Sequence, residues 1–255
     1  MNLLKPTALV LLVFSLSANA EDQQERVRFK LRKVAHAFDA MPAHVRTKYA
    51  NLKDKAYKAR ENEKYFTSIV AITDAQALFK GDLDLFFLNG NCFAQLHDVD
   101  KAISHYEKVL AVDPFHIFTL INIIEINYFA GRYEETIKYI SRLNAIIERP
   151  QIQQQMPLLD FKHLIALSKL SEKKPDQYQL EVNKLRSKYT YMDDNPFFYY
   201  AHALKLFEAG EKHEGLKWIY KAYHIFNTPA MIETWNKALV DTGYIGAYQL
   251  IFSEQ

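Results

Sequence analysis

Cysteine, glycine and proline are scarce in this chain. Its 255 residues include one cysteine, seven glycines and eight prolines. The single cysteine, Cys92, cannot form an internal disulfide, so the fold must be stabilised by packing. Glycines at positions 81, 131, 210 and 243 fall where a helical pattern stops, and the prolines divide the chain into pieces of helical length.

The chain also lacks an excess of charge of either sign, with 32 Lys and Arg against 30 Asp and Glu. This balance provides no electrostatic footprint for nucleic acid, and no nucleic-acid partner is expected. The one local excess lies between Arg26 and Lys33. We interpret it as the solvated face of a first helix, and a contact with acidic lipid or an envelope polymer is the alternative.

The N-terminal segment has the pattern of a signal peptide. Lys5 precedes an apolar stretch at 8–16, and the Ala-Asn-Ala run ending at Ala20 fits a cleavage site. The apolar stretch is about half of the ~20 residues that a membrane-spanning helix needs, which disfavours a retained anchor. We therefore expect residues 1–20 to be cleaved after Ala20, and the chain to be exported, periplasmic or secreted, without a membrane span.

The rest of the chain has a helical period. Apolar residues recur at spacings of three and four, as in Ile103, Tyr106, Val109 and Leu110, and no stretch alternates like a strand. The class is all-α. Residues 83–116 align with 117–150 at an offset of 34, and residues 49–82 fit one period earlier.

These aligned segments resemble the tetratricopeptide repeat. The matching residues in 83–116 are Gly90, Phe93, Ala102, Tyr106 and the Asp113-Pro114 stop, and those in 117–150 include Gly131 and Tyr133. The resemblance implies a right-handed α-α superhelix of about five helix-turn-helix units with capping helices. Small residues such as Gly90 would let paired helices approach closely, and Tyr106 would fill the gap toward the next unit.

The breaks divide the chain in a definite way. After the signal peptide at 1–20, we expect an N-terminal capping helix at 21–48 and a repeat array at 49–228. The units of the array are 49–82, 83–116, 117–150, a degenerate 151–195 and 196–228. Residues 229–255 would form a C-terminal capping helix and tail.

Catalytic and metal-binding patterns are incomplete in the sequence. His213-Glu214 lacks the second histidine of a zinc-protease helix, and Cys92 has no nearby basic activator. The run Asp193-Asp194-Asn195 lacks the glycine and distal glutamate of a calcium loop. We expect no enzymatic activity, cofactor or metal.

In the tetratricopeptide family the first helix of each unit lines a concave binding face. Carried over position by position, the resemblance implies a candidate partner-binding set of Lys53, Tyr57, Arg60, Phe87, Asn91, Glu125, Tyr128 and Tyr200. For Tyr128 and its neighbours Phe118 and Ile121, a place in the core is an open alternative. Lys53 and Asn91 lie near positions of the family's carboxylate clamp, but Tyr57 replaces its first asparagine, so that clamp is not expected.

The sequence therefore predicts a non-enzymatic scaffold that binds a peptide or a partner domain through the concave face. The alternative is a structural or assembly subunit of an envelope complex that acts through its caps or convex face. Trp235, Tyr244 and Tyr248 near the C-terminus suggest this second possibility.

Overall fold

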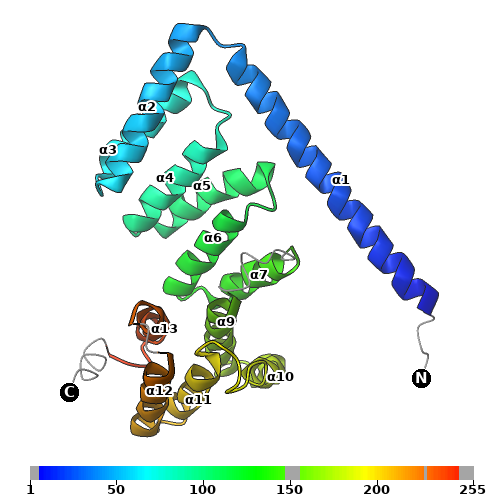
Figure 1. Cartoon of the computed structure of the whole chain (residues 1–255), viewed down its shortest axis with the longest axis vertical. Helices are drawn as coiled ribbons and strands as arrows, with labels where there is room; N and C mark the ends of the chain where they lie inside the picture. Colours follow the sequence, from blue (N-terminus) through cyan, green and yellow to red (C-terminus); the bar gives the residue numbers. More distant parts are fainter. Residues whose placement is uncertain (1–5, 147–155, 227–228, 247–255) are drawn as a thin grey trace. The chain divides into compact units, whose positions relative to one another are not determined.

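The structure is a computed structural model that describes residues 6–146, 156–226 and 229–246 (Figure 1). Every regular element in those ranges is an α-helix, which confirms the all-α class. The chain divides into two compact units, residues 1–119 (unit 1) and 120–255 (unit 2). Among the described helices, none is both long and apolar enough to cross a membrane.

The described helices are distributed over both units. Those of unit 1 are α1 (Pro6–Asp39), α2 (Ala43–Glu61), α3 (Tyr65–Leu78), α4 (Leu83–Gln95) and α5 (Val99–Val112). After α6 (Ile117–Phe129), which begins in unit 1 and continues into unit 2, come α7 (Tyr133–Asn144), α9 (Met156–Ser171), α10 (Pro175–Arg186), α11 (Phe197–Glu208), α12 (Lys212–Phe226) and α13 (Pro229–Asp241).

Consecutive helices pack as pairs across short turns, as predicted for helix-turn-helix units. The pairs are α2 with α3, α4 with α5, α9 with α10, and α11 with α12. The pair of α9 and α10 lies in the segment predicted to be degenerate, and Pro175 occupies the first turn of α10, where a missing N–H costs nothing. Two features differ from expectation. Helix α2 begins at Ala43, ahead of the predicted start of the first repeat at residue 49. Helix α1 continues through Ala20, the predicted cleavage position, without a break.

Four of the turns between paired helices, those of α2–α3, α4–α5, α6–α7 and α11–α12, are built the same way, and the first three give the 34-residue period a physical basis. Glu63, His97 and Gly131 follow one another at intervals of 34 residues, and each has a positive φ. Gly210 adopts this conformation in the turn between α11 and α12. The N–H of the next residue in each turn donates to the carbonyl five residues earlier, which is the Schellman arrangement that ends a helix.

Small residues set the close approach of paired helices in unit 1. Ala56 of α2 and Ala71 and Ala75 of α3 are buried between the two helices. Between α4 and α5, a Cβ added at Gly90 would clash with the ring of Tyr106, which is 1% exposed. This confirms the predicted role of Gly90, because any larger side chain would force these helices apart.

Unit 2 has its own core, centred on α9 and α11. The ring of Phe161 on α9 contacts those of Phe197 and Tyr200 on α11 and of Trp235 on α13, with centroids 5.3–6.1 Å apart. Aromatic pairs at such distances add to the energy of burial. Helix α13 therefore packs onto the core formed by α9 and α11. The predicted tail beyond residue 246 lies outside the described residues.

The left-handed turn position makes a testable prediction about stability. A left-handed backbone costs a residue with a Cβ about 1–2 kcal/mol, and glycine avoids this cost. Glu63→Gly should therefore raise the free energy of unfolding by about 0.5–1 kcal/mol, measured by urea denaturation. Gly131→Ala should lower it by a similar amount through the backbone alone, because an added Cβ would meet nothing within 4 Å.

Glu61→Gly is the matched control, since Glu61 is the last residue of α2 and has helical backbone. There glycine should destabilise the protein. If Glu63→Gly and Glu61→Gly lowered stability equally, the left-handed backbone at Glu63 would not be the feature that favours glycine in this turn.

Candidate functional site

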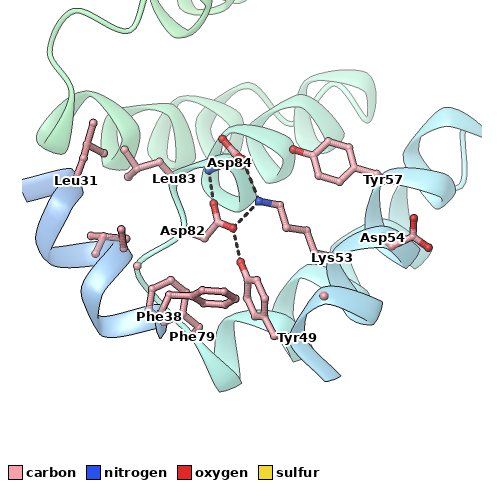
Figure 2. A pocket seen from close by; sticks show the side chains of 14 residues that line it. Leu31, Phe38, Tyr49, Lys53, Asp54, Tyr57, Phe79, Asp82, Leu83 and Asp84 are labelled. Atoms are coloured by element: carbon pink, nitrogen blue, oxygen red, sulfur yellow. Dashed lines mark hydrogen bonds and ion pairs between the residues drawn. The ribbon is translucent and has the colours of Figure 1, made fainter. Parts of the chain in front are cut away.

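A cleft of about 710 Å³ lies in unit 1 between α1, α2 and the start of α4 (Figure 2). One side is apolar and is formed by Leu31, Val34 and Phe38 of α1 together with Phe79 and Leu83. The other end is polar and is formed by Tyr49, Lys53, Asp54 and Tyr57 of α2 with Asp82 and Asp84. Its volume is in the range of small-molecule and side-chain binding pockets.

Asp82 organises the polar end of the cleft. It is the N-cap residue of α4, where its Oδ1 accepts a hydrogen bond of 2.9 Å from the backbone N–H of Asp84. Its Oδ2 accepts hydrogen bonds from the hydroxyl of Tyr49 and from Lys53 Nζ, the latter at 2.6 Å. One carboxylate therefore begins α4 and ties that helix to two successive turns of α2.

Lys53 lies between two carboxylates. Its Nζ is 2.6 Å from Asp82 Oδ2 and 2.9 Å from Asp84 Oδ2. Burial alone would lower the pKa of Lys53, but the hydrogen bonds to both aspartates outweigh burial and raise it. The ammonium group therefore stays charged, and its charge is balanced by Asp82 and Asp84 of the same chain.

The two tyrosines of the site remain neutral for a related reason. Burial, followed by the hydrogen bond to Asp82, raises the pKa of Tyr49 well above its ordinary value. Burial and the negative charge of Asp84 raise the pKa of Tyr57. Both hydroxyl groups thus keep their protons at physiological pH.

An aromatic cluster borders the apolar side of the cleft. The rings of Phe38, Tyr49 and Phe79 contact one another edge to face, with centroids 5.3–5.8 Å apart. These contacts join α1, α2 and the segment after α3, so three parts of unit 1 fix the shape of the cleft. The Tyr49 ring belongs to this cluster while its hydroxyl reaches Asp82, as Figure 2 shows.

The structure brings together two of the eight predicted partner-binding residues. Lys53 and Tyr57 both line the cleft, and the hydroxyl of Tyr57 points toward its polar end (Figure 2). Arg60 is exposed one turn further along α2 and does not line the cleft. Lys53 is already engaged by two aspartates of its own chain.

Phe87 and Asn91 on α4 have roles in packing. The ring of Phe87 contacts those of Tyr106 and His116, with centroids 5.9 Å and 5.4 Å away. Asn91 Oδ1 accepts a hydrogen bond of 2.6 Å from the Tyr106 hydroxyl. Both residues are half-buried, and their contacts hold α5 and the following turn against α4.

Glu125 on α6 is held by a buried lysine. Lys162 Nζ on α9 donates to Glu125 Oε1 at 2.6 Å, and the Lys162 side chain is only 9% exposed. A buried ammonium group is stable only when it is paired, so Glu125 serves to compensate Lys162. This ion pair lies within unit 2.

The structure corrects two residues of the predicted partner-binding face. Tyr128 and Tyr200 are 1% and 0% exposed. The Tyr128 hydroxyl donates to the carbonyl of Ala238 at 2.7 Å, and the Tyr200 hydroxyl donates to Asn236 Oδ1 at 2.6 Å. Both tyrosines therefore belong to the core beneath α13, because a later helix covers the face that the repeat pattern leaves open.

Sequence reasoning missed Tyr49 and Asp82. An aspartate just before the apolar start of α4 is an N-cap signal, so the position of Asp82 could have been recognised. Its link to Tyr49 joins residues 33 positions apart, and no local pattern indicates that contact.

No group of three or more His, Cys, Asp or Glu side chains within the described residues is arranged to hold a metal ion. In the cleft the carboxylates of Asp82 and Asp84 instead share the ammonium group of Lys53.

The role of Asp82 as a link between helices can be tested with Asp82→Asn. Asparagine still caps a helix, so the variant should begin α4 normally but lose the ion pair with Lys53. We expect the free energy of unfolding to fall by about 1–3 kcal/mol, measured by urea denaturation.

Asp54→Asn is the matched control. Asp54 also lines the cleft, but it pairs with Lys58 on the surface of the same helix, where both side chains are more than half exposed. Such a pair contributes about 0.3–0.5 kcal/mol, so this change should have little effect. Equal losses in the two variants would contradict a special role for Asp82.

No family model and no curated protein sequence matches the chain. The solved structure MamA MSR-1 C2 has a TM-score of 0.44 and 13% identity, and the match covers 76% of this chain and 98% of that chain. A MamA mutant has a TM-score of 0.44 and 15% identity, with coverage of 69% and 96%.

The repeated arrangement of the fold is evident in the helices of the chain itself. The helix pairs, the left-handed turn residues at intervals of 34 and the close contact at Gly90 are features of the chain's own structure. The chain is an all-α protein built largely from pairs of consecutive helices.

Proposed function

We propose that the chain is a non-enzymatic scaffold of the cell envelope or exterior that binds a protein partner in the cleft between α1, α2 and α4. The observation that carries this proposal is the form of the cleft. Its apolar side and its polar end are each formed by side chains from more than one helix, and Asp82 links α2 to the start of α4. A preformed site of this kind binds without first having to order itself.

The protonation states of the cleft favour binding over catalysis. A general base or nucleophile must be free to accept a proton or to attack, and catalytic groups are usually tuned toward neutral pH. Here the pKa of Lys53 and of Tyr57 is raised, which is the direction that keeps both groups protonated. Asp82 already accepts three hydrogen bonds.

The exported location is part of the proposal and is supported by the N-terminal sequence. Cleavage after Ala20 would remove the first part of α1 and leave the residues from Glu21 onward. The cleft residues of α1 begin at Leu31, so the mature chain would retain the complete site.

Assembly through the C-terminal cap has less support than binding in the cleft. Trp235 and Tyr244, which suggested that possibility, are 4% and 7% exposed and belong to the core of unit 2. Tyr248, the third residue, lies outside the described residues. The cleft is therefore the better candidate for the place where a partner binds.

Site-specific photo-crosslinking in cells tests the proposed function. A photoreactive amino acid at position 57, in the cleft, should produce one or a few discrete crosslinked products with another protein. The same amino acid at position 66 should not, because Phe66 is 72% exposed on α3 and does not line the cleft. The products are measured by immunoblotting and identified by mass spectrometry.

Two outcomes would contradict this proposal. Identical products from both positions would indicate general surface contact and no site. The absence of any product both from position 57 and from position 54, whose residue Asp54 also lines the cleft, with the chain expressed at its ordinary level, would mean that the cleft does not bind a protein.

A further inference from the structure

We propose that the partner presents to the cleft an arginine side chain next to an apolar one. This inference rests on the proposed function and specifies the chemistry of the bound segment. It follows from three features of the cleft: the negative charge at its polar end, the ring and hydroxyl of Tyr57 at that end, and the adjacent apolar side.

Among the residues that line the cleft, the polar end has more carboxylates than ammonium groups. Asp82 and Asp84 share the single ammonium group of Lys53. The oxygens of Asp82 are occupied by Tyr49, Lys53 and the N–H of Asp84, whereas the side chain of Asp84 is 64% exposed and contacts Lys53 through Oδ2. Asp84 therefore presents a carboxylate to an incoming group, which favours a cation and opposes an acidic segment.

Tyr57 adds a second contact at the same end. Its side chain is 37% exposed, and its hydroxyl forms no hydrogen bond within the described part of the chain. Figure 2 shows this hydroxyl directed toward Asp84 and Lys53. A tyrosine ring and a carboxylate side by side suit a guanidinium group, which can stack on the ring while its N–H groups bind the carboxylate.

The apolar side of the cleft requires an apolar neighbour for that arginine. Leu31 on α1, which is 39% exposed, and Leu83 at the start of α4 both line the cleft. Covering them with a hydrocarbon side chain removes apolar surface from water. The bound segment therefore has a basic and an apolar side chain at adjacent positions.

Peptide binding to the purified full-length chain tests this inference. The probes are a fluorescein-labelled peptide of alternating arginine and leucine, the same peptide with citrulline in place of arginine, and the same peptide with glutamate. Citrulline keeps the shape of arginine but lacks its charge. Fluorescence anisotropy at physiological salt should show binding at least about threefold tighter for the arginine peptide than for the citrulline peptide, and no binding of the glutamate peptide.

Variants then locate the effect. Asp84→Asn should remove the preference for arginine over citrulline, whereas Asp74→Asn, at an exposed position on α3 outside the cleft, should leave it unchanged. Tyr57→Leu should weaken binding of the arginine peptide, and it serves as the second test if Asp84→Asn fails to fold. Circular dichroism checks the helical content of each variant.

The outcomes separate the two proposals. Crosslinking from position 57 together with equal binding of arginine, citrulline and glutamate peptides would overturn this inference and leave the proposed function intact. A preference for arginine that persists in Asp84→Asn would also overturn it. Self-association through the basic Arg26–Lys33 stretch of a second copy would appear as a crosslink between two copies of this chain, and would overturn the arrangement proposed here.

Discussion

The hydrogen bonds of the Asp82 carboxylate are the constraint on which the candidate site depends. With its two oxygens Asp82 caps α4 and holds Tyr49 and Lys53 of α2. The Tyr49 ring in turn contacts Phe38 of α1. Three helices of unit 1 are thus linked through Asp82 and Tyr49, and the cleft exists because their spacing is fixed. Since the groups are only partly buried, the cluster stabilises the fold while leaving Asp84 available to a ligand.

Unit 2 uses the same chemistry for a structural purpose. Asp160 on α9 is 1% exposed, and its Oδ2 accepts hydrogen bonds of 2.6 Å from both Lys188 and the hydroxyl of Tyr189. This joins α9 to the segment after α10. The difference between the two clusters lies in what surrounds them: Asp160 is enclosed by protein, whereas the cluster around Asp82 borders a cleft. The same set of groups can therefore stabilise a helix pair or form a binding site.

Local features of the fold could be predicted from the sequence. The burial of a residue beneath a helix that follows much later in the chain could not. The 34-residue period was visible in the sequence, and the turns at Glu63, His97 and Gly131 follow one another at this interval, although only Gly131 is the glycine that such a turn favours. The prediction for Tyr200 was wrong because Trp235, on a helix that follows the array, covers it. Asp82 is recognisable as a cap, but its bonds to α2 depend on how two helix pairs meet. Position within a repeat indicates which way a side chain points, and only the tertiary structure shows what lies there.

The most direct test of this account is native-state hydrogen exchange in unit 1. If Asp82 couples α2 to the start of α4, amides in residues 49–61 and in residues 82–95 should open together, with the same free energy of opening. Asp82→Asn should then lower the protection of both segments in parallel. If residues 82–95 opened at a distinctly lower free energy than residues 49–61 in the unaltered chain, the two helices would not be coupled, and the cleft could not be the preformed site described here.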